Sequence, residues 1–222
     1  MRTTLDHPLA AIFNRAALGS YPKPDGTIES VGPLDGPCDS ITVFSSHVVI
    51  AADVSDQWVR DHTPARWDAD RADLGNVLVQ LVLDMSHQLG QPAAAPSTLC
   101  AASHQAAIVH GDLTRGGEAQ PAWAAYRTDI ESHRYRSVGG NGTIALGRGP
   151  AGRQDLYIEV DQDSTNSTSR TSRELLRTAK SLVPTGTGLF GSAQLHDTRV
   201  LRSVIAAGFE PVAMEVLFLT RR

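Results

Sequence analysis

The pattern of hydrophobic and polar positions changes twice between residues 154 and 183. Residues 154–160 alternate between apolar side chains and polar or aromatic ones, which predicts a strand with one buried face. Residues 163–172 then contain no large apolar side chain. From residue 175 to residue 183 apolar side chains recur at helical spacing, and Pro184 ends the pattern. The predicted order is therefore a strand, a polar loop and a helix.

The start of this helix is the most chemically suggestive place in the chain. Thr171 and Glu174 fit the S/T-x-x-E capping box, so we expect the helix to begin where the hydroxyl-rich run ends. A helix start carries N–H groups without intrahelical partners and a partial positive charge, to which Arg170 and Arg173 would add. The pattern indicates an anion site, and a solvated polar loop is the open alternative.

A second group of elements follows the first. Residues 189–195 predict a strand, and Asp197 is placed to cap a further helix. Gly208 fits the glycine that ends such a helix, and residues 212–219 form an apolar run that predicts a last strand.

This order of elements resembles the C-terminal part of the GCN5-related N-acetyltransferase (GNAT) superfamily, as does Ala206-Ala207-Gly208-Phe209 at the end of the last helix. The resemblance covers residues 140–222. It implies an α+β fold in which a mixed, mostly antiparallel sheet is flanked by helices, with an N-terminal α/β extension or small domain. It also implies acetyl-CoA or another acyl-CoA as co-substrate.

In that family the motif Gln/Arg-x-x-Gly-x-Gly/Ala cradles the pyrophosphate of acetyl-CoA. Counting back from Leu175 places this hexad on residues 167–172, where Arg170 and Ser172 occupy the glycine positions. Glycine lets backbone N–H groups approach a phosphate closely, so here the guanidinium of Arg170 would bind the phosphate instead. The coenzyme contacts that the resemblance implies are Val160, Ser167, Ser169, Arg170, Thr171, Ser172, Arg173 and Asp197.

Two titratable residues are candidates for proton transfer. In many family members a Tyr of the last helix protonates the leaving thiolate, and spacing from Gly208 puts Val204 at that position. Glu159 lies on the strand that often carries the general base, although alternation turns it away from the face of Val160 unless a bulge intervenes. His196, at the end of the next strand, is the other candidate.

Composition narrows the class of protein without naming a function. The chain has 222 residues, of which 41% are hydrophobic and 20% charged, as in ordinary soluble globular proteins. A net charge of -4 gives no overall attraction to nucleic acid or to anionic membranes. Cys38 and Cys100 suggest neither a disulfide scaffold nor a metal site, and no segment is long and apolar enough to span a bilayer. We therefore expect a cytoplasmic protein without a metal or a membrane partner.

The N-terminal region has weaker patterns. The stretch from His110 to Gln120, rich in Gly and charge, predicts a boundary between residues 1–115 and a GNAT-like acyl-CoA-binding domain at 116–222. The elements expected before it are a helix within 5–18, a hairpin from 41–44 and 48–52, a helix at 72–89, and strands at 99–102 and 106–109. They fit a separate small domain, an extension of the same sheet, or a degenerate second GNAT-like unit.

Two further signals favour plain structural roles. The segment Gly147–Gly152 matches G-x-G-x-x-G, but it precedes a strand and not a helix, so we expect a hairpin turn there. Arg127, Arg134 and Arg136 are expected on a solvated face.

The leading hypothesis is an N-acyltransferase that moves an acyl group from coenzyme A to the amine of a small molecule by direct attack. The resemblance implies that a backbone N–H near Val160 polarises the thioester carbonyl. One alternative is a GNAT fold that has lost the coenzyme and serves as a binding module. Another is a transferase that takes its acyl group from a carrier protein or an aminoacyl-tRNA, the only version with a nucleic-acid partner. A homodimer is also left open.

Overall fold

The computed structural model describes residues 7–64, 74–106, 111–138, 140–161 and 168–219. The helices are α1 (Pro8–Ala17), α2 (Asp56–His62), α3 (Leu74–Leu89), α4 (Pro121–Ala124), α5 (Thr168–Leu182) and α6 (Thr198–Ala206). The strands are β1 (Ile28–Ser30), β2 (Cys38–Phe44), β3 (His47–Ala51), β4 (Ser97–Ser103), β5 (Asp112–Arg115), β6 (Thr128–Ser137), β7 (Gly140–Arg148), β8 (Gln154–Val160), β9 (Gly188–Gln194) and β10 (Glu210–Leu219). A short 3₁₀ helix, η2 (Pro150–Gly152), connects β7 to β8.

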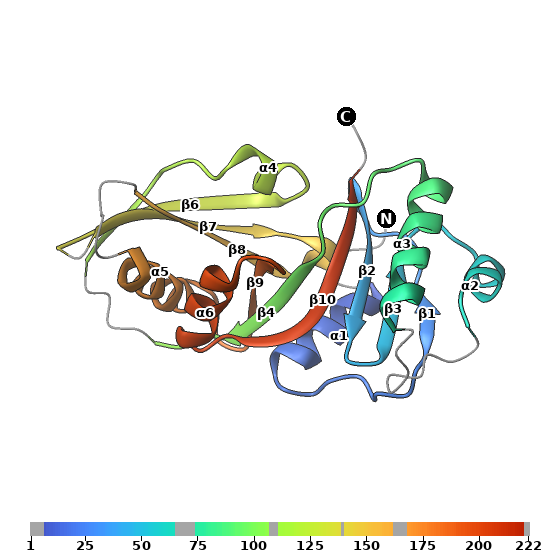
Figure 1. The fold of residues 1–222 in the computed structure, drawn as a ribbon. Coiled ribbons are helices and arrows are strands. Elements are labelled where there is room, and N and C mark those ends of the chain that lie inside the picture. The colour runs from blue at the N-terminus through green and yellow to red at the C-terminus, as the bar shows by residue number, and fades with distance from the viewer. Residues whose placement is uncertain (1–6, 65–73, 107–110, 139, 162–167, 220–222) are drawn as a thin grey trace.

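These strands form one mixed sheet in the order β1-β3-β2-β10-β4-β9-β8-β7-β6-β5 (Figure 1). The pairs β1–β3 and β8–β9 run parallel, and the other neighbouring pairs run antiparallel. The predicted fold class, α+β with a mixed and mostly antiparallel sheet, is confirmed.

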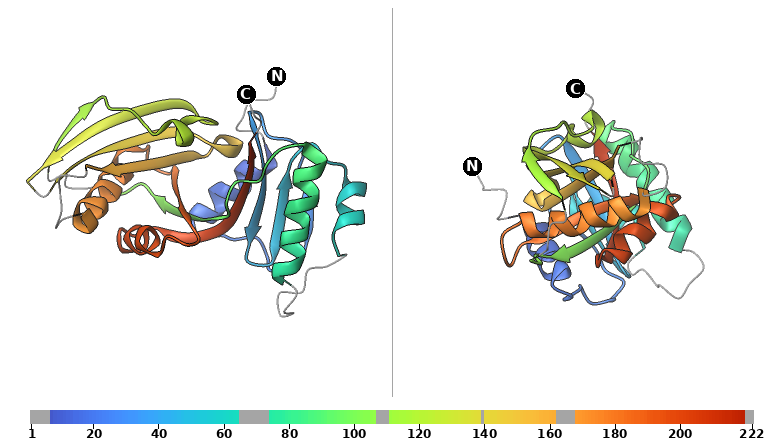
Figure 2. Two further views of the ribbon diagram at one scale, coloured as in Figure 1. Left: turned by 45° about the horizontal axis from the view of Figure 1, so that its top comes forward. Right: turned by 90° about the vertical axis from the view of Figure 1, so that its left-hand side faces the viewer.

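The sheet joins the N-terminal and C-terminal parts of the chain. β4 comes from the N-terminal region, yet it lies between β9 and β10 and pairs with both. The turned views show β4 and β10 running alongside each other through the middle of the molecule, between the strands at either end (Figure 2). A division of the chain at residue 115 stays a prediction, and the hydrogen-bonded ladder crosses it.

Alternation along β4 separates two apolar cores. Leu99 and Ala101 point to the face that α1 covers, where Phe13 is fully buried. Cys100 and Ala102 point to the opposite face, beneath α5 and α6. The two helices and α1 thus cover opposite faces of the sheet.

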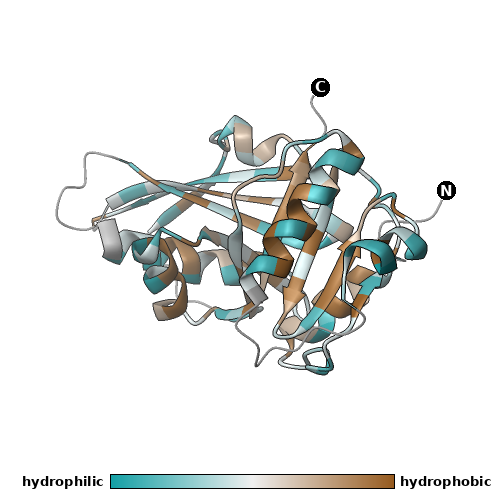
Figure 3. Cartoon of the chain, turned by 45° about the vertical axis from the view of Figure 1, so that its right-hand side comes forward, coloured by the Kyte–Doolittle hydropathy of each residue, from teal (hydrophilic) through white to brown (hydrophobic). Residues whose placement is uncertain are grey.

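A third core lies under α3, at the other end of the sheet. Leu81 and Met85 are fully buried there against β2, β3 and β10. The hydropathy colouring shows these strands as brown, hydrophobic bands behind α3 (Figure 3). Helical spacing in residues 74–89 therefore produces the amphipathic helix that the sequence predicts.

Several predicted turns are confirmed. β2 and β3 form the expected hairpin, in which Ser45 adopts a left-handed φ of 52°. The segment Gly147–Gly152 leads from β7 through η2 into the antiparallel β8, with no dinucleotide-binding helix after it. Gly208 has a φ of 84° immediately after the C-cap of α6, which is the conformation that a helix-ending glycine supplies.

The predicted start of α5 is wrong. The helix begins at Thr168, and Thr171 is a fully buried residue within it, so Thr171 is not the N-cap. The physical reason is packing: Thr171, Leu175 and Ala179 recur every four residues and form one buried stripe against the sheet. The predicted strand at 106–109 is not found at Ala106, and its other residues lie outside the described part of the chain.

Candidate functional site

The parallel strands β8 and β9 separate after a short paired stretch. Their register joins Gln154–Leu156 to Leu189–Gly191, although β8 continues to Val160 and β9 to Gln194. We call residues 157–160 of β8 and 192–194 of β9 the β8–β9 divergence. The ladder between the two strands ends here, so the backbone groups on the β9 side of residues 157–160 do not pair with β9.

The backbone of Val160 faces this divergence. The N–H of Asp161 donates to the carbonyl of Asn141, on the β7 side of the strand, at 3.0 Å. Successive N–H groups of a strand point to opposite sides, so the N–H of Val160 points away from β7 and toward the divergence. The side chain of Val160 packs against the core under α5. Its predicted contact with an acyl carbonyl stays a prediction.

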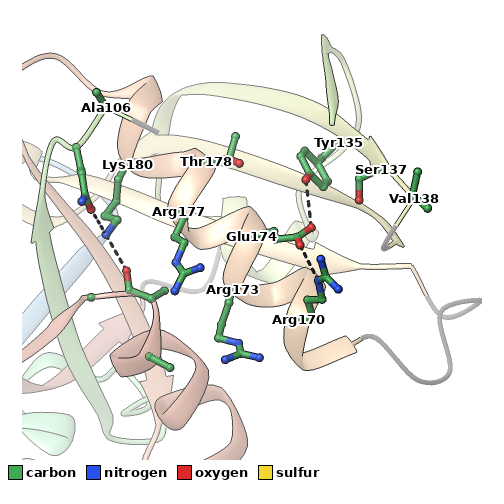
Figure 4. Close-up of a pocket in the computed structure, with 14 residues that line it drawn as sticks. Ala106, Tyr135, Ser137, Val138, Arg170, Arg173, Glu174, Arg177, Thr178 and Lys180 are labelled. Carbon is green, nitrogen blue, oxygen red and sulfur yellow. Dashed lines mark hydrogen bonds and ion pairs between the residues drawn. The ribbon is translucent and has the colours of Figure 1, made fainter. Parts of the chain in front are cut away.

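A basic cavity of about 840 Å³ lies along the outer side of α5 (Figure 4). Its charged and aromatic lining includes Tyr135, Arg170, Arg173, Glu174, Arg177 and Lys180. Four of these six residues are cations, in a protein whose net charge is -4. Such a concentration of positive charge favours an anionic ligand.

Arg170 is held along the outside of the helix. Its Nε donates to Glu174 one turn later at 3.0 Å, and its side chain is 74% exposed. Glu174 also accepts a hydrogen bond from the hydroxyl of Tyr135 at 3.3 Å. Arg170 thus lines the cavity while most of its side chain is exposed to solvent.

Lys180 closes the other end of the cavity. Its ammonium donates to Oε1 of Gln105 at 2.8 Å and to the carbonyl of Ala207 at 2.7 Å. Burial lowers the pKa of Lys180, and the neighbouring charge of Arg177 lowers it further. Lys180 therefore ties α5 to the end of α6 and to the segment after β4.

The position at which α5 begins determines which backbone N–H groups could bind an anion. The first N–H groups of a helix lack intrahelical acceptors, and those that the structure describes here belong to Thr168, Ser169 and Arg170. Ser172 is the fifth residue, and its N–H belongs to the helical ladder. The predicted anion position therefore moves one turn toward the N-terminus, and Ser169 lies within it.

The predicted coenzyme contacts on α5 differ in burial. Thr171 is fully buried, Ser172 and Arg173 are half-buried, and Arg170 is exposed. Ser167 lies outside the described residues. The coenzyme roles of these positions stay predictions.

The predicted residues after β9 occupy the turn into α6. His196 is exposed in that turn. Asp197 caps α6 as expected, because its Oδ1 accepts the N–H of Val200 at 3.0 Å. Val204 is buried in the core between α5 and α6 and packs as an apolar residue.

Glu159 lies on the face of the sheet opposite to Val160. β8 keeps an unbroken register with β7, so no bulge rotates the side chain. The carboxylate is exposed and accepts a hydrogen bond from the hydroxyl of Tyr157 at 3.2 Å. Val160 and α5 thus share one face, whereas Glu159 belongs to the other.

Sequence reasoning missed a buried ionic network on the paired half of β8. Arg153 donates to Asp155 and to Glu215 at 2.7 Å, and Arg127 donates to Asp155 at 2.8 Å. All four side chains are at most 3% exposed. The expectation of a solvated Arg127 is wrong, because Asp155 and two stacked aromatic rings enclose its guanidinium.

The network balances two cations with two carboxylates. Burial alone would lower the pKa of Arg153, but Asp155 and Glu215 raise it well above its ordinary value. One sequence signal pointed here: Glu215 stands inside the apolar run 212–219, and a charge in a buried strand requires a partner. The network fixes the N-terminal half of β8 against β10.

No family model matches the chain, and no curated protein matches it. Solved structures that match include a GCN5-related N-acetyltransferase from Kribbella flavida, with a TM-score of 0.40, 15% identity, and coverage of 68% of this chain and 65% of that one. An acetyltransferase of the GNAT family from Colwellia psychrerythraea matches with a TM-score of 0.35 and 13% identity, covering 63% of this chain and 62% of that one. A tandem GNAT protein from the clavulanic acid biosynthesis pathway has a TM-score of 0.32 and 11% identity, over 81% of this chain and 63% of that one.

GNAT acetyltransferases are thus among the structural neighbours of this chain, as the order of its elements predicts. The chain spans less than two thirds of the length of each of these three proteins. The likeness concerns the fold alone.

Two further findings concern the described residues. They contain no group of three or more His, Cys, Asp or Glu side chains placed to hold a metal ion. None of their helices has the length and apolar character needed to cross a membrane.

Proposed function

We propose that this chain is an acyltransferase that moves an acyl group from coenzyme A to the amine of a small molecule. The β8–β9 divergence carries the proposal. Alternation directs the N–H of Val160 away from β7, to the side of β8 on which pairing with β9 has ended, and the side chain of Val160 packs against the core under the basic helix α5. An extended thioester chain could pair there with backbone groups of β8.

The charge of the cavity supports coenzyme A as the donor. Coenzyme A carries a diphosphate and a 3′-phosphate, and guanidinium groups bind phosphate through paired, charge-assisted hydrogen bonds. The first turn of α5 would hold the diphosphate through its N–H groups, as helix starts do for anions. Arg170 and Arg177, which line the cavity, would neutralise the remaining charge.

The chemistry would be direct attack of the neutral amine on the thioester carbon. Holding both reactants in place supplies most of the acceleration, since it removes the entropy cost of their encounter. The N–H of Val160 would donate to the carbonyl oxygen as negative charge develops. Glu159, on β8 within the divergence, and His196, in the turn after β9, are the predicted proton acceptors.

Calorimetric titration with acetyl-CoA and with free CoA tests the donor. We expect Arg170→Glu and Arg177→Glu each to weaken binding about tenfold, because each removes one charge-assisted phosphate contact and reverses a charge. Arg202→Glu is the matched control, because Arg202 is an exposed arginine on α6 outside the cavity lining. It should change the dissociation constant less than about twofold.

Activity is then measured as amine-dependent release of the CoA thiol from acetyl-CoA. Absence of coenzyme binding at millimolar concentration would overturn the proposal and favour another acyl donor or a module without coenzyme. Equal effects of all three charge reversals would show that the cavity is not where the phosphates bind.

A further inference from the structure

Tyr157 lies on β8 at the point where pairing with β9 ends. It is the first residue after the stretch that pairs with β9, so it stands at the root of the divergence. Its side chain projects on the face opposite to α5, because Leu156 and Ile158 on either side of it belong to the core under that helix. Any group that reacts at the root of the divergence would meet this side chain.

The phenol ring of Tyr157 packs against the indole ring of Trp123. The two rings lie 5.6 Å apart at an interplanar angle of 38°. Gly147 lies next to the indole, because a Cβ at that position would be 3.2 Å from the indole and 3.3 Å from Ile130, and these neighbours would have to shift by a few tenths of an ångström. Trp123 is therefore the ring that contacts the phenol of Tyr157.

That hydroxyl reaches Glu159. Tyr157 donates to Oε2 of Glu159 at 3.2 Å, and the two residues lie two positions apart on the same face of β8. Burial raises the pKa of Tyr157, and the charge and the hydrogen bond of Glu159 raise it further. The pair thus consists of a phenol that keeps its proton at neutral pH and an exposed carboxylate that can accept one.

We propose that Tyr157 and Glu159 form a proton relay for acyl transfer, with Glu159 as the base toward the amine and Tyr157 as the acid toward the departing thiolate. The inference rests on the proposed function. Attack forms the C–N bond while the π electrons of the carbonyl move to oxygen. Collapse of that intermediate breaks the C–S bond, and the electron pair stays on sulfur.

The proton balance closes without another reactant. Glu159 takes one proton from the nitrogen, Tyr157 gives its proton to the sulfur, and the proton on Glu159 then moves to the phenolate along the existing hydrogen bond. The net result is an amide and a free thiol, with both residues returned to their starting states. The relay also makes use of a residue that faces away from Val160, on the opposite face of the same strand.

Kinetics of variants test the relay, with acetyl-CoA as donor and ethylamine, benzylamine and spermidine as acceptors. We expect Tyr157→Phe and Glu159→Gln each to lower kcat roughly 100-fold, the usual range for loss of a general acid or base. Affinity for acetyl-CoA should stay within about twofold, since neither residue lies on the basic face. The double variant should be no slower than the single ones, because both act in one path.

Tyr21→Phe and Glu210→Gln are the matched controls. Both residues are exposed, and both lie outside the divergence. Unchanged kcat in Tyr157→Phe while the wild type transfers would overturn the relay and leave the proposed function standing. Losses that multiply in the double variant would also overturn it. No transfer by the wild type to any of the three amines, despite coenzyme binding, would overturn both proposals.

A spectroscopic titration tests the contact between Tyr157 and Glu159 without catalytic turnover. The difference in tyrosinate absorbance between the wild type and Tyr157→Phe reports the pKa of Tyr157. Glu159→Gln should lower that pKa, because it removes a negative charge next to the phenolate. Two groups of charges lie near the pair. Near Tyr157, Arg127 contacts the Trp123 ring and donates to Asp155. Near Glu159, Arg134 bonds to Asp161 and to Thr143, which is the cross-strand neighbour of Glu159. An unmoved pKa would overturn the relay, since the proton could not pass between uncoupled groups.

Discussion

The two halves of β8 have the same alternation of side chains and opposite environments. In the paired half, Asp155 is buried and bonded to two arginines. In the diverging half, Glu159 is exposed and meets a single phenol. Both carboxylates project on one face of the strand, on either side of Tyr157.

The two carboxylates differ in burial, although they occupy equivalent positions in the alternation of β8. η2, α1 and the segment around Arg127 close over the paired half, so its charge must be neutralised inside the protein. Beside Glu159, β9 no longer pairs with β8, and the carboxylate is exposed to solvent. One strand thus carries a buried, paired carboxylate among its first residues and an exposed carboxylate among its last.

The largest effect is expected from Arg153→Met. The change leaves Glu215 buried without its partner, which should lower the free energy of unfolding by about 3–5 kcal/mol. Urea denaturation followed by circular dichroism measures it. The double variant Arg153→Met with Glu215→Leu is the control, because it removes both charges and leaves Arg127 paired with Asp155. It should regain most of the loss, and a double variant as unstable as the single one would contradict the ionic account.

A smaller effect is expected from Gly149→Ala. A Cβ at this position would lie 2.2 Å from Oδ2 of Asp155, so the carboxylate must move out of its network. We expect a loss of about 1–3 kcal/mol by the same denaturation measurement. Gly191→Ala is the matched control, because nothing lies within 4 Å of its added carbon. Equal stability of the two variants would show that the paired half tolerates displacement of its carboxylate.

The smallest effect is expected from Tyr157→Phe. It removes one hydrogen bond to an exposed carboxylate and keeps the ring against Trp123, so stability should fall by no more than about 1 kcal/mol. Denaturation of this variant beside Arg153→Met compares the two halves of the strand directly. A loss as large as that of Arg153→Met would mean that the diverging half is structural and not chemical.

Much of the fold could be predicted because local patterns agree with it. Alternation in residues 154–160, helical spacing in 175–183 and the glycine at 208 each report on residues close in sequence. The start of α5 was misplaced because Thr171 and Glu174 fit a capping box, while Thr171 instead continues the buried stripe. At this position the burial of Thr171 outweighs its preference for the N-cap, so the helix begins earlier, at Thr168.

The candidate site was predictable only in part. The basic residues on α5 were recognised from their position after a strand and a polar run, and they do line one cavity. In the sequence Tyr157 is only one aromatic position of an alternating strand, because its place at the root of the divergence depends on where β9 stops pairing. No local signal in β8 reports the length of a ladder with a strand more than 30 residues further along.

By itself the sequence determined the order of the elements between residues 154 and 219, the buried face of β8 and the charged character of α5, because each depends on the spacing of neighbouring residues. Only the tertiary structure decided that β4 inserts between β9 and β10, that Arg127 is buried, and that β8 and β9 part after three pairs. Those features arise from contacts between residues distant in the chain, and their free energies come from burial and charge pairing that no local spacing encodes.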